Sequence, residues 1–361
     1  MIVRSQARDW ITPERLEACK VFYRSADASE MLKHFATYTD KDFDALALYS
    51  TKVAEHLEPL GDLRVGIAKG DNWKGAARTL MGAGYVLKTP GGRVMTGNEK
   101  KKTGEQPLCA TTQAGDVFFI FPPQDFPERL RDGDIDMVVG AGYDIQVNYA
   151  MVPNLNLNGE MANPKTRIEA MRRELERSDC GIPLVHMGYS PVVSVLMTRR
   201  DSGLRHLGEM RKRRANTGLS EYPHILDQYG RYAEVPFNRV KKATGGAETQ
   251  LMAGFADVAS DVVQTGGSLI GAIGSIRLIR GDNGKVVRVN YSDTWALASP
   301  HAMADAGTKD RIGKRDRIDM FAKRLVTGVA AARVLEPDLF MPLYEDGLQE
   351  YEIAETRIGD A

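Results

Sequence analysis

A strand followed at once by a glycine turn and a helix places the tightest constraint on this 361-residue chain. Residues 258–263 have the apolar, β-branched composition of a buried strand, and the turn Thr265-Gly266-Gly267-Ser268 follows it. Two glycines at the start of a helix free backbone amides that can surround a phosphate. The pattern therefore predicts an α/β fold with an anion-binding turn.

Acidic side chains lie close to this turn in the sequence. Asp257 and Asp261 precede it directly, and Glu248 lies in a short predicted helix upstream. A carboxylate beside a bound phosphate repels that phosphate unless it serves another part of the ligand, such as sugar hydroxyls or Mg²⁺. A sugar phosphate meets both demands, so we predict a sugar-phosphate site here.

Size and charge narrow the class of protein. The chain is long enough for two domains with a sizeable core. Lys plus Arg equals Asp plus Glu at 48 each, which argues against a nucleic-acid or membrane partner. The sequence has no 18-residue apolar run and no signal-peptide pattern, and its three cysteines lack metal-binding spacing. We therefore expect a cytoplasmic protein.

Predicted strands and helices alternate from Leu63 onward. The segments LRVGIAKG, DVFFIF and IDMVVGAGYD each have the composition of a buried strand, and the run PLVHMGYSPVVSVLMTRR predicts one long strand that opens a second α/β unit near Ile182. In parallel α/β architecture, ligands bind at the carboxyl ends of the strands. Lys69 and the turn from Gly140 to Gly142 are expected at that edge.

These patterns predict four regions. Residues 1–61 form a helical N-terminal extension, residues 62–150 with 273–300 form lobe I, and residues 182–272 form lobe II with the phosphate turn. Residues 301–361 are expected to form one amphipathic helix, over 310–333, and an acidic irregular tail.

In this order, the segments resemble the catalytic subunit of ATP phosphoribosyltransferase, the first enzyme of histidine biosynthesis. The resemblance covers roughly residues 62–300 and depends on several short motifs taken together. The matching motifs are the Lys69-Gly70 strand end, Asp125-Phe126-Pro127, Gly133-Asp134-Ile135-Asp136, Ser220-Glu221-Tyr222-Pro223, and the run from Glu248 through Ala256-Asp257 and Asp261 to Thr265–Leu269.

The resemblance implies two α/β lobes of the type II periplasmic-binding kind with the active site between them. It also implies transfer of the phosphoribosyl group of phosphoribosyl pyrophosphate (PRPP) to N1 of ATP, with release of pyrophosphate. Mg²⁺ would be bound by PRPP, with no metal held by side chains alone.

The resemblance also assigns roles to individual residues. Asp261 and Glu248 would hold the ribose hydroxyls and, with Lys69 facing the phosphates, form the catalytic set. The other PRPP contacts would be Asp257, Thr265, Gly266, Gly267, Ser268 and Leu269. The ATP side would involve Gly140, Gly142, Tyr143, Asp144 and Arg93.

The sequence departs from the family near the ATP side. Two arginines that the family places there are absent, since this chain has Phe121–Asp125 (FPPQD) and Gly142-Tyr143-Asp144 instead. Arg93 or Lys100–Lys102 could supply the charge, and another acceptor than ATP stays open. The tail is closer to the short family form, which implies a homo-oligomer and a histidyl-tRNA-synthetase-like regulatory subunit.

A non-catalytic ligand-binding or regulatory module is the alternative from another class, because the same bilobal fold serves such proteins. A receptor would be expected to carry a signal peptide, and a transcription factor a basic helix-turn-helix. Neither pattern is evident, and neither alternative explains acidic residues beside a phosphate turn. The sequence therefore favours the enzyme.

Overall fold

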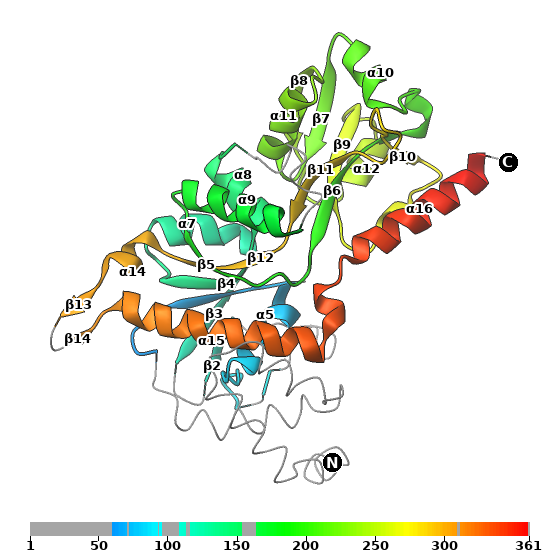
Figure 1. The fold of residues 1–361 in the computed structure, drawn as a ribbon. Helices are drawn as coiled ribbons and strands as arrows, with labels where there is room; N and C mark the ends of the chain where they lie inside the picture. The colour runs from blue at the N-terminus through cyan, green and yellow to red at the C-terminus, as the bar shows by residue number, and fades with distance from the viewer. Residues whose placement is uncertain are drawn as a thin grey trace, which may run out of the picture. The chain divides into compact units, whose positions relative to one another are not determined.

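The computed structural model describes residues 60–70, 72–92, 94–95, 108–112, 116–153, 164–308 and 311–359. The predicted N-terminal extension lies outside these residues except for its last two positions, and Arg93 and Lys100–Lys102 also lie outside them. The chain divides into two compact units (Figure 1). Unit 1 comprises Met1–Ala141, Asp179–Tyr189 and Thr294–Met341, and unit 2 comprises Gly142–Ser178, Ser190–Asp293 and Pro342–Ala361.

Unit 1 is built on a sheet with the strand order β2-β3-β1-β4-β12-β5. These strands are β1 (Val65–Ala68), β2 (Cys109–Thr111), β3 (Val117–Phe121), β4 (Met137–Gly142), β5 (Ile182–His186) and β12 (Thr294–Ala298). Strand β1 runs parallel to β3 and β4, as the predicted alternation of strands and helices requires. All residues of β1 and β4 are buried, which explains their continuous apolar sequence.

Two helices from distant parts of the sequence pack together in unit 1. Helix α15 (Lys314–Leu335) lies against α5 (Asn72–Gly82), and both contribute to the main apolar core of the unit (Figure 1). Gly328 of α15 allows this approach, because a Cβ atom there would lie 2.1 Å from the carbonyl oxygen of Thr79. The other described elements are η2 (Pro123–Asp125), α7 (Phe126–Arg131), α14 (Pro300–Ala304), β13 (Gly307–Thr308), β14 (Arg311–Ile312) and η6 (Pro337–Phe340).

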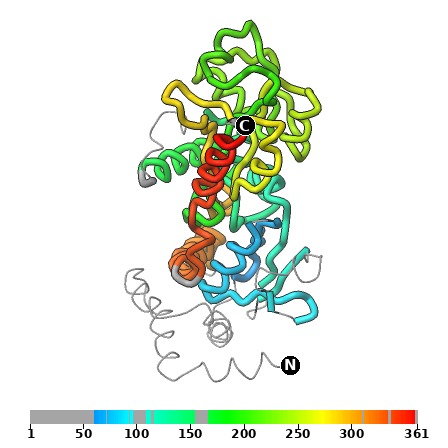
Figure 2. The backbone as a smooth tube through the Cα atoms, turned by 90° about the vertical axis from the view of Figure 1, so that its right-hand side faces the viewer, coloured from blue at the N-terminus to red at the C-terminus, as the bar shows by residue number. Residues whose placement is uncertain are grey.

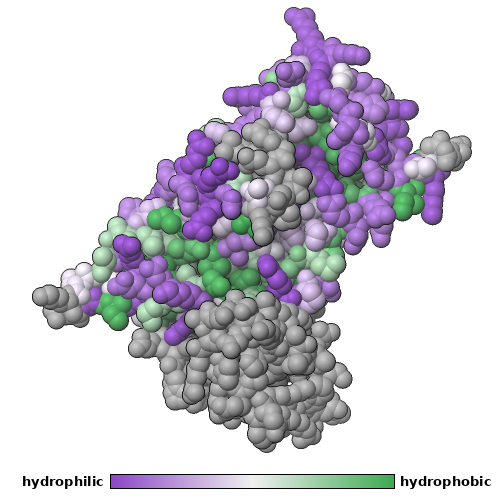
Figure 3. All heavy atoms as spheres, viewed as in Figure 1, coloured by the Kyte–Doolittle hydropathy of each residue, from purple (hydrophilic) through white to green (hydrophobic). Residues whose placement is uncertain are grey.

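Unit 2 has a sheet with the strand order β10-β6-β9-β7-β8, and β11 also pairs with β6. Its strands are β6 (Val192–Arg199), β7 (Asn216–Ser220), β8 (Phe237–Lys242), β9 (Val258–Val263), β10 (Ile276–Leu278) and β11 (Arg288–Ser292). Its helices are α8 (Tyr143–Ala150), α9 (Pro164–Arg177), η5 (Arg200–Ser202), α10 (Leu207–Lys212), α11 (Pro223–Tyr232), α12 (Ala247–Met252), α13 (Gly267–Gly271) and α16 (Leu343–Gly359). Hydrophilic residues cover most of the face of unit 2 seen in Figure 3.

The two sheets share one arrangement. In unit 1, β1 lies between β3 and β4, and β12 comes next. In unit 2, β7 lies between β8 and β9, and the antiparallel strand β6 comes next. This repeated order is that of a two-lobed α/β protein of the type II periplasmic-binding kind, which confirms the predicted fold for the described part of the chain.

The run from 183 to 200 corrects the prediction of one long strand. It forms two strands in different units, β5 in unit 1 and β6 in unit 2. Gly188 has a φ of +69° and Ser190 a φ of +51°, and left-handed residues cannot continue a strand. Lobe II therefore does not begin at residue 182.

Two other predicted boundaries need correction. Residues 273–293 were expected in lobe I, but β10 and β11 pair antiparallel with β6 and so belong to unit 2. Helix α8 was also expected in lobe I. It lies in unit 2, where the hydroxyl of Ser292 donates to Asp144 at 2.7 Å and the amide of His224 donates to Asn148 at 3.1 Å.

The predicted amphipathic helix over 310–333 corresponds to α15, but the expected irregular tail is wrong. Residues 343–359 form α16, which packs on unit 2 beside α13 and β6 (Figure 2, red). Tyr344, Leu348 and Tyr351 recur at intervals of four and three residues, so they form one apolar stripe that joins the core of unit 2. The many acidic residues obscured this stripe in the sequence.

We expect Gly328→Ala to destabilise the protein. Overpacking at a close helix contact costs about 1–3 kcal/mol, and better helix propensity offsets only part of it. Gly208→Ala in α10 is the matched control, because no atom lies within 4 Å of the added Cβ. Urea unfolding of both variants checks this, and equal midpoints for the two would contradict the packing argument.

Candidate functional site

The predicted helix, strand, turn and helix around residue 261 are all present in unit 2. Helix α12 leads to β9, whose bounds match the predicted strand, and the turn from Thr265 opens α13. Gly266 precedes α13 with a φ of +76°, a conformation that favours glycine. Thr265, Gly267 and Ser268 are exposed, whereas Gly266 and Leu269 are buried.

The structure brings two of the predicted catalytic residues together. The side chains of Asp261 in β9 and Glu248 in α12 are hydrogen-bonded to each other. Burial, the hydrogen bond to Glu248 and the negative charge of Glu248 together raise the pKa of Asp261 to about 8, and the amide of Val262, which donates at 2.8 Å, opposes the shift. The Asp261 carboxyl is therefore mostly protonated at neutral pH.

A second buried acid lies in the same unit. Burial raises the pKa of Asp144, although this carboxyl accepts hydrogen bonds from Ser292 and Tyr222. The negative charges of Asp144 and Asp261 both raise the pKa of the Tyr222 hydroxyl, with Asp144 having the larger effect. Asp144, Tyr222 and Asp261 are thus electrostatically linked within unit 2.

Asp257 does not join this group. It lies before the first residue of β9, opposite the end that leads into the turn, and its carboxylate accepts the amide of Thr217 at 2.7 Å. Arg213 lies 3.5 Å from the same carboxylate. Four residues of extended strand span about 13 Å, so Asp257 and Asp261 lie far apart although they are close in the sequence. Asp257 binds the neighbouring strand β7 at the start of β9, at the opposite end of this strand from the turn.

Leu269 also has a structural position. Its side chain is 1% exposed and belongs to the apolar core of unit 2, so only the backbone of this residue is available to a ligand. The exposed polar part of the turn consists of Thr265 and Ser268 with the backbone around Gly267.

Lys69 and Gly140 belong to unit 1, at the carboxyl ends of β1 and β4. Lys69 is exposed, and its amide donates to the carbonyl of Phe121 at 2.7 Å. Gly140 has a φ of +90°, and a Cβ there would lie 2.5 Å from the hydroxyl of Tyr189. Gly140 therefore accommodates a fully buried tyrosine.

Three further predicted ATP-side residues, Gly142, Tyr143 and Asp144, lie in unit 2. Gly142 precedes α8, and the hydroxyl of Tyr143, which is fully buried, donates to Glu174. Asp144 is 5% exposed. The side chains of Tyr143 and Asp144 therefore form hydrogen bonds within unit 2. Arg93 lies outside the described residues.

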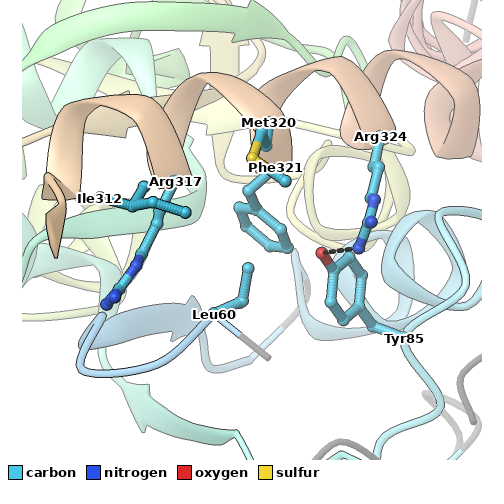
Figure 4. A pocket seen from close by; sticks show the side chains of 7 residues that line it. All are labelled: Leu60, Tyr85, Ile312, Arg317, Met320, Phe321 and Arg324. Atoms are coloured by element: carbon cyan, nitrogen blue, oxygen red, sulfur yellow. Dashed lines mark hydrogen bonds between the residues drawn. The ribbon is translucent and has the colours of Figure 1, made fainter. Parts of the chain in front are cut away.

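A separate pocket lies in unit 1 (Figure 4). It has a volume of about 280 Å³ and is lined by Leu60, Tyr85, Ile312, Arg317, Met320, Phe321 and Arg324. Arg324 donates to the hydroxyl of Tyr85 at 3.1 Å, and Arg317 pairs with Asp62. None of the predicted site residues lines it.

In the described part of the chain, no group of three or more His, Cys, Asp or Glu side chains is arranged to hold a metal ion. None of the described helices combines the length and apolar composition needed to cross a bilayer.

Three side chains that act on Asp261 or Asp144 are absent from the site residues that the sequence predicts. The charge of Glu221 raises the pKa of Asp261, Tyr222 donates to Asp144, and Ser292 donates to the same carboxyl. The motif Ser220–Pro223 contains Glu221 and Tyr222 and could have identified both from the sequence. Ser292 had none, because it approaches Asp144 from 148 residues away.

We expect Asp261→Asn to stabilise the protein at pH 8. The folded-state pKa of about 8 exceeds the usual 3.8, so unfolding releases a proton between these values, and the stability of the parent falls as pH rises through this window. Asparagine removes this effect, so we expect a gain of about 1–3 kcal/mol at pH 8 that vanishes near pH 4. Thermal unfolding between pH 4 and 8 measures it, with Asp201→Asn at an exposed position as control. A gain that does not depend on pH would count against the raised pKa of Asp261.

In contrast, we expect Asp257→Asn to destabilise the protein. Loss of the charged acceptor for the Thr217 amide and Arg213 should cost about 1–2 kcal/mol of stability. Urea unfolding at pH 7 measures this loss, and a neutral result would show that the carboxylate is not needed to hold β7 against β9.

Comparison with known proteins yields similarity of fold only. No protein-family model matches the sequence, and no curated protein matches it. Among solved structures, the ATP phosphoribosyltransferase (HisG:HisZ) complex from Thermotoga maritima is similar at 15% identity and a TM-score of 0.48, over 74% of this chain and 98% of that chain. The aliphatic sulphonate binding protein SsuA from Escherichia coli is similar at 14% identity and a TM-score of 0.41, over 82% and 84%. XAC2383 from Xanthomonas citri bound to ATP is similar at 12% identity and a TM-score of 0.41, over 83% and 99%.

Proposed function

We propose that this protein is a phosphoribosyltransferase that moves the phosphoribosyl group of PRPP to N1 of ATP, with release of pyrophosphate. One observation carries the proposal. A turn with exposed Thr265 and Ser268 follows strand β9, whose Asp261 is hydrogen-bonded to Glu248 of helix α12. Groups suited to sugar hydroxyls and groups suited to a phosphate thus follow one another along the chain within one unit.

The turn suits the 5-phosphate of PRPP. Backbone amides after Gly266 and the hydroxyls of Thr265 and Ser268 can donate to phosphate oxygens without a cationic side chain. The paired carboxyls suit the ribose. Its hydroxyl groups can donate to both carboxyls and so replace the proton that Asp261 holds in the free protein.

The chemistry that follows needs no nucleophilic side chain. The bond from ribose C1 to pyrophosphate breaks, the bond from C1 to N1 of ATP forms, and positive charge develops on the ribose between these events. Ionised Asp261 and Glu248 would stabilise that charge. Lys69 would bind the departing pyrophosphate together with the Mg²⁺ that PRPP brings as part of the substrate.

The proposal extends to the acceptor and to partners. We assign ATP to the side of Gly140, Gly142 and Asp144, with Arg93 as a further contact, and we place the enzyme in the cytoplasm as a homo-oligomer with a histidyl-tRNA-synthetase-like regulatory subunit. These assignments follow the sequence resemblance. Sedimentation of the purified chain tests the oligomer directly.

Calorimetric titration with PRPP plus Mg²⁺, and then with ATP, tests the function. Binding of both supports the proposed reaction, which a turnover assay then follows by release of pyrophosphate. Binding of PRPP alone indicates a phosphoribosyltransferase with another acceptor. Binding of neither overturns the proposal in favour of a ligand-sensing module of the same fold.

We expect Ser268→Ala to raise the KM for PRPP about ten-fold, because a hydrogen bond to a charged group is lost. The KM for ATP should stay within two-fold, as should both values for the control Thr249→Ala at an exposed position of α12. Equal effects on both substrates would argue against a 5-phosphate site at the turn.

Asp261→Asn should lower turnover at least 100-fold while the protein stays folded. The substitution removes a charge that develops its full effect only as pyrophosphate leaves. Steady-state rates with saturating PRPP and ATP measure the loss, and near-parental turnover would remove Asp261 from the mechanism.

A further inference from the structure

The turn at Thr265 is in backbone contact with the C-terminal helix of the same unit. Gly266 and Gly347 of α16 face each other, and both are buried. A Cβ on Gly347 would lie 2.3 Å from the carbonyl oxygen of Thr265, and a Cβ on Gly266 would lie 2.6 Å from the Cα of Gly347. Neither glycine can be replaced without movement of the turn or the helix.

Two kinds of contact fix α16 in this place. Tyr344, Leu348 and Tyr351 join the apolar core of unit 2, which also contains Leu269 from the turn. On the same helix, Glu345 accepts from Arg288 at 2.6 Å and Glu352 from Arg280 at 3.0 Å. Further ion pairs join Glu355 to Arg200, Arg277 and Arg280 at 3.3–3.6 Å.

The contact gives the turn two different sides. On one side, α16 covers Gly266 and packs against the carbonyl of Thr265. On the other, Gly267 and Ser268 are exposed, and a Cβ on Gly267 would meet only the hydroxyl of Thr265, at 3.9 Å. A short glycine turn with one side blocked by a rigid helix has few alternative conformations, so its polar groups keep one direction.

We propose that α16, through Gly347, is a positioning element for the turn and thereby sets its affinity for phosphate. In this role the helix acts through the turn. The identity of the ligand rests on the proposed function, whereas the effect of α16 on the turn does not.

Gly347→Ala tests the proposal. Alanine favours the helix, so the variant retains α16, but the added methyl displaces the turn. We expect at least a five-fold rise in the deuterium exchange rate of amides 265–269 and a ten-fold weaker Kd for PRPP with Mg²⁺, with the Kd for ATP unchanged. Gly271→Ala in α13 is the matched control, since no atom lies within 4 Å of its added Cβ, and it should leave all three values unchanged.

Glu355→Gln provides a second variant that leaves the glycine contact intact. It weakens the ion pairs that hold α16 and should also speed exchange at 265–269, whereas Glu350→Gln at an exposed position should not. Exchange at 265–269 that is unchanged in both Gly347→Ala and Glu355→Gln overturns the positioning role. Failure of the parent protein to bind PRPP overturns the proposed function instead, and exchange alone then decides the positioning role.

Discussion

In each unit of this protein, a helix from the last part of the chain packs closely against the backbone of another segment, and a glycine in that helix allows the approach. In unit 1, Gly328 of α15 lies over the carbonyl of Thr79 in α5. In unit 2, Gly347 of α16 lies over the carbonyl of Thr265. An added methyl group at either contact would force the neighbouring backbone to move, so these two helices are integral parts of the units they cover. The polar turn of unit 2 depends on the second of these contacts for its shape.

Unit 2 uses its acidic groups in two different ways. On α16, glutamates are neutralised by arginines of the unit, and these pairs hold the helix in place. Near the turn, Asp261 and Glu248 hydrogen-bond to each other, and burial together with this contact raises the pKa of Asp261 to about 8. A pair of carboxyls maintained in this way costs stability. That cost is typical of a site whose groups are arranged for a ligand with hydroxyl groups or developing positive charge.

Much of the fold could be predicted from local patterns. The apolar runs of β1, β4 and β9 predict buried strands, and all three strands form. The glycine and hydroxyl residues after β9 predict a turn, which is also present. Prediction failed where one apolar run served two units. The segment 183–200 reads as a single strand, and only the left-handed residues Gly188 and Ser190 divide it. Left-handed serine has no reliable sequence signal, because its strain is maintained by surrounding structure.

The sequence by itself determined which residues make up the candidate site. They are the aspartate of β9, the glycine turn with its two hydroxyl side chains, and a glutamate in the helix before β9. These residues are close along the chain, so local geometry suffices to assemble them. Tertiary structure alone decided that Asp257 serves the sheet, that Ser292 and Tyr222 bind Asp144, and that α16 covers the turn. Such contacts join residues 40 to 148 positions apart, and no periodicity in a sequence records which distant segments will pack together.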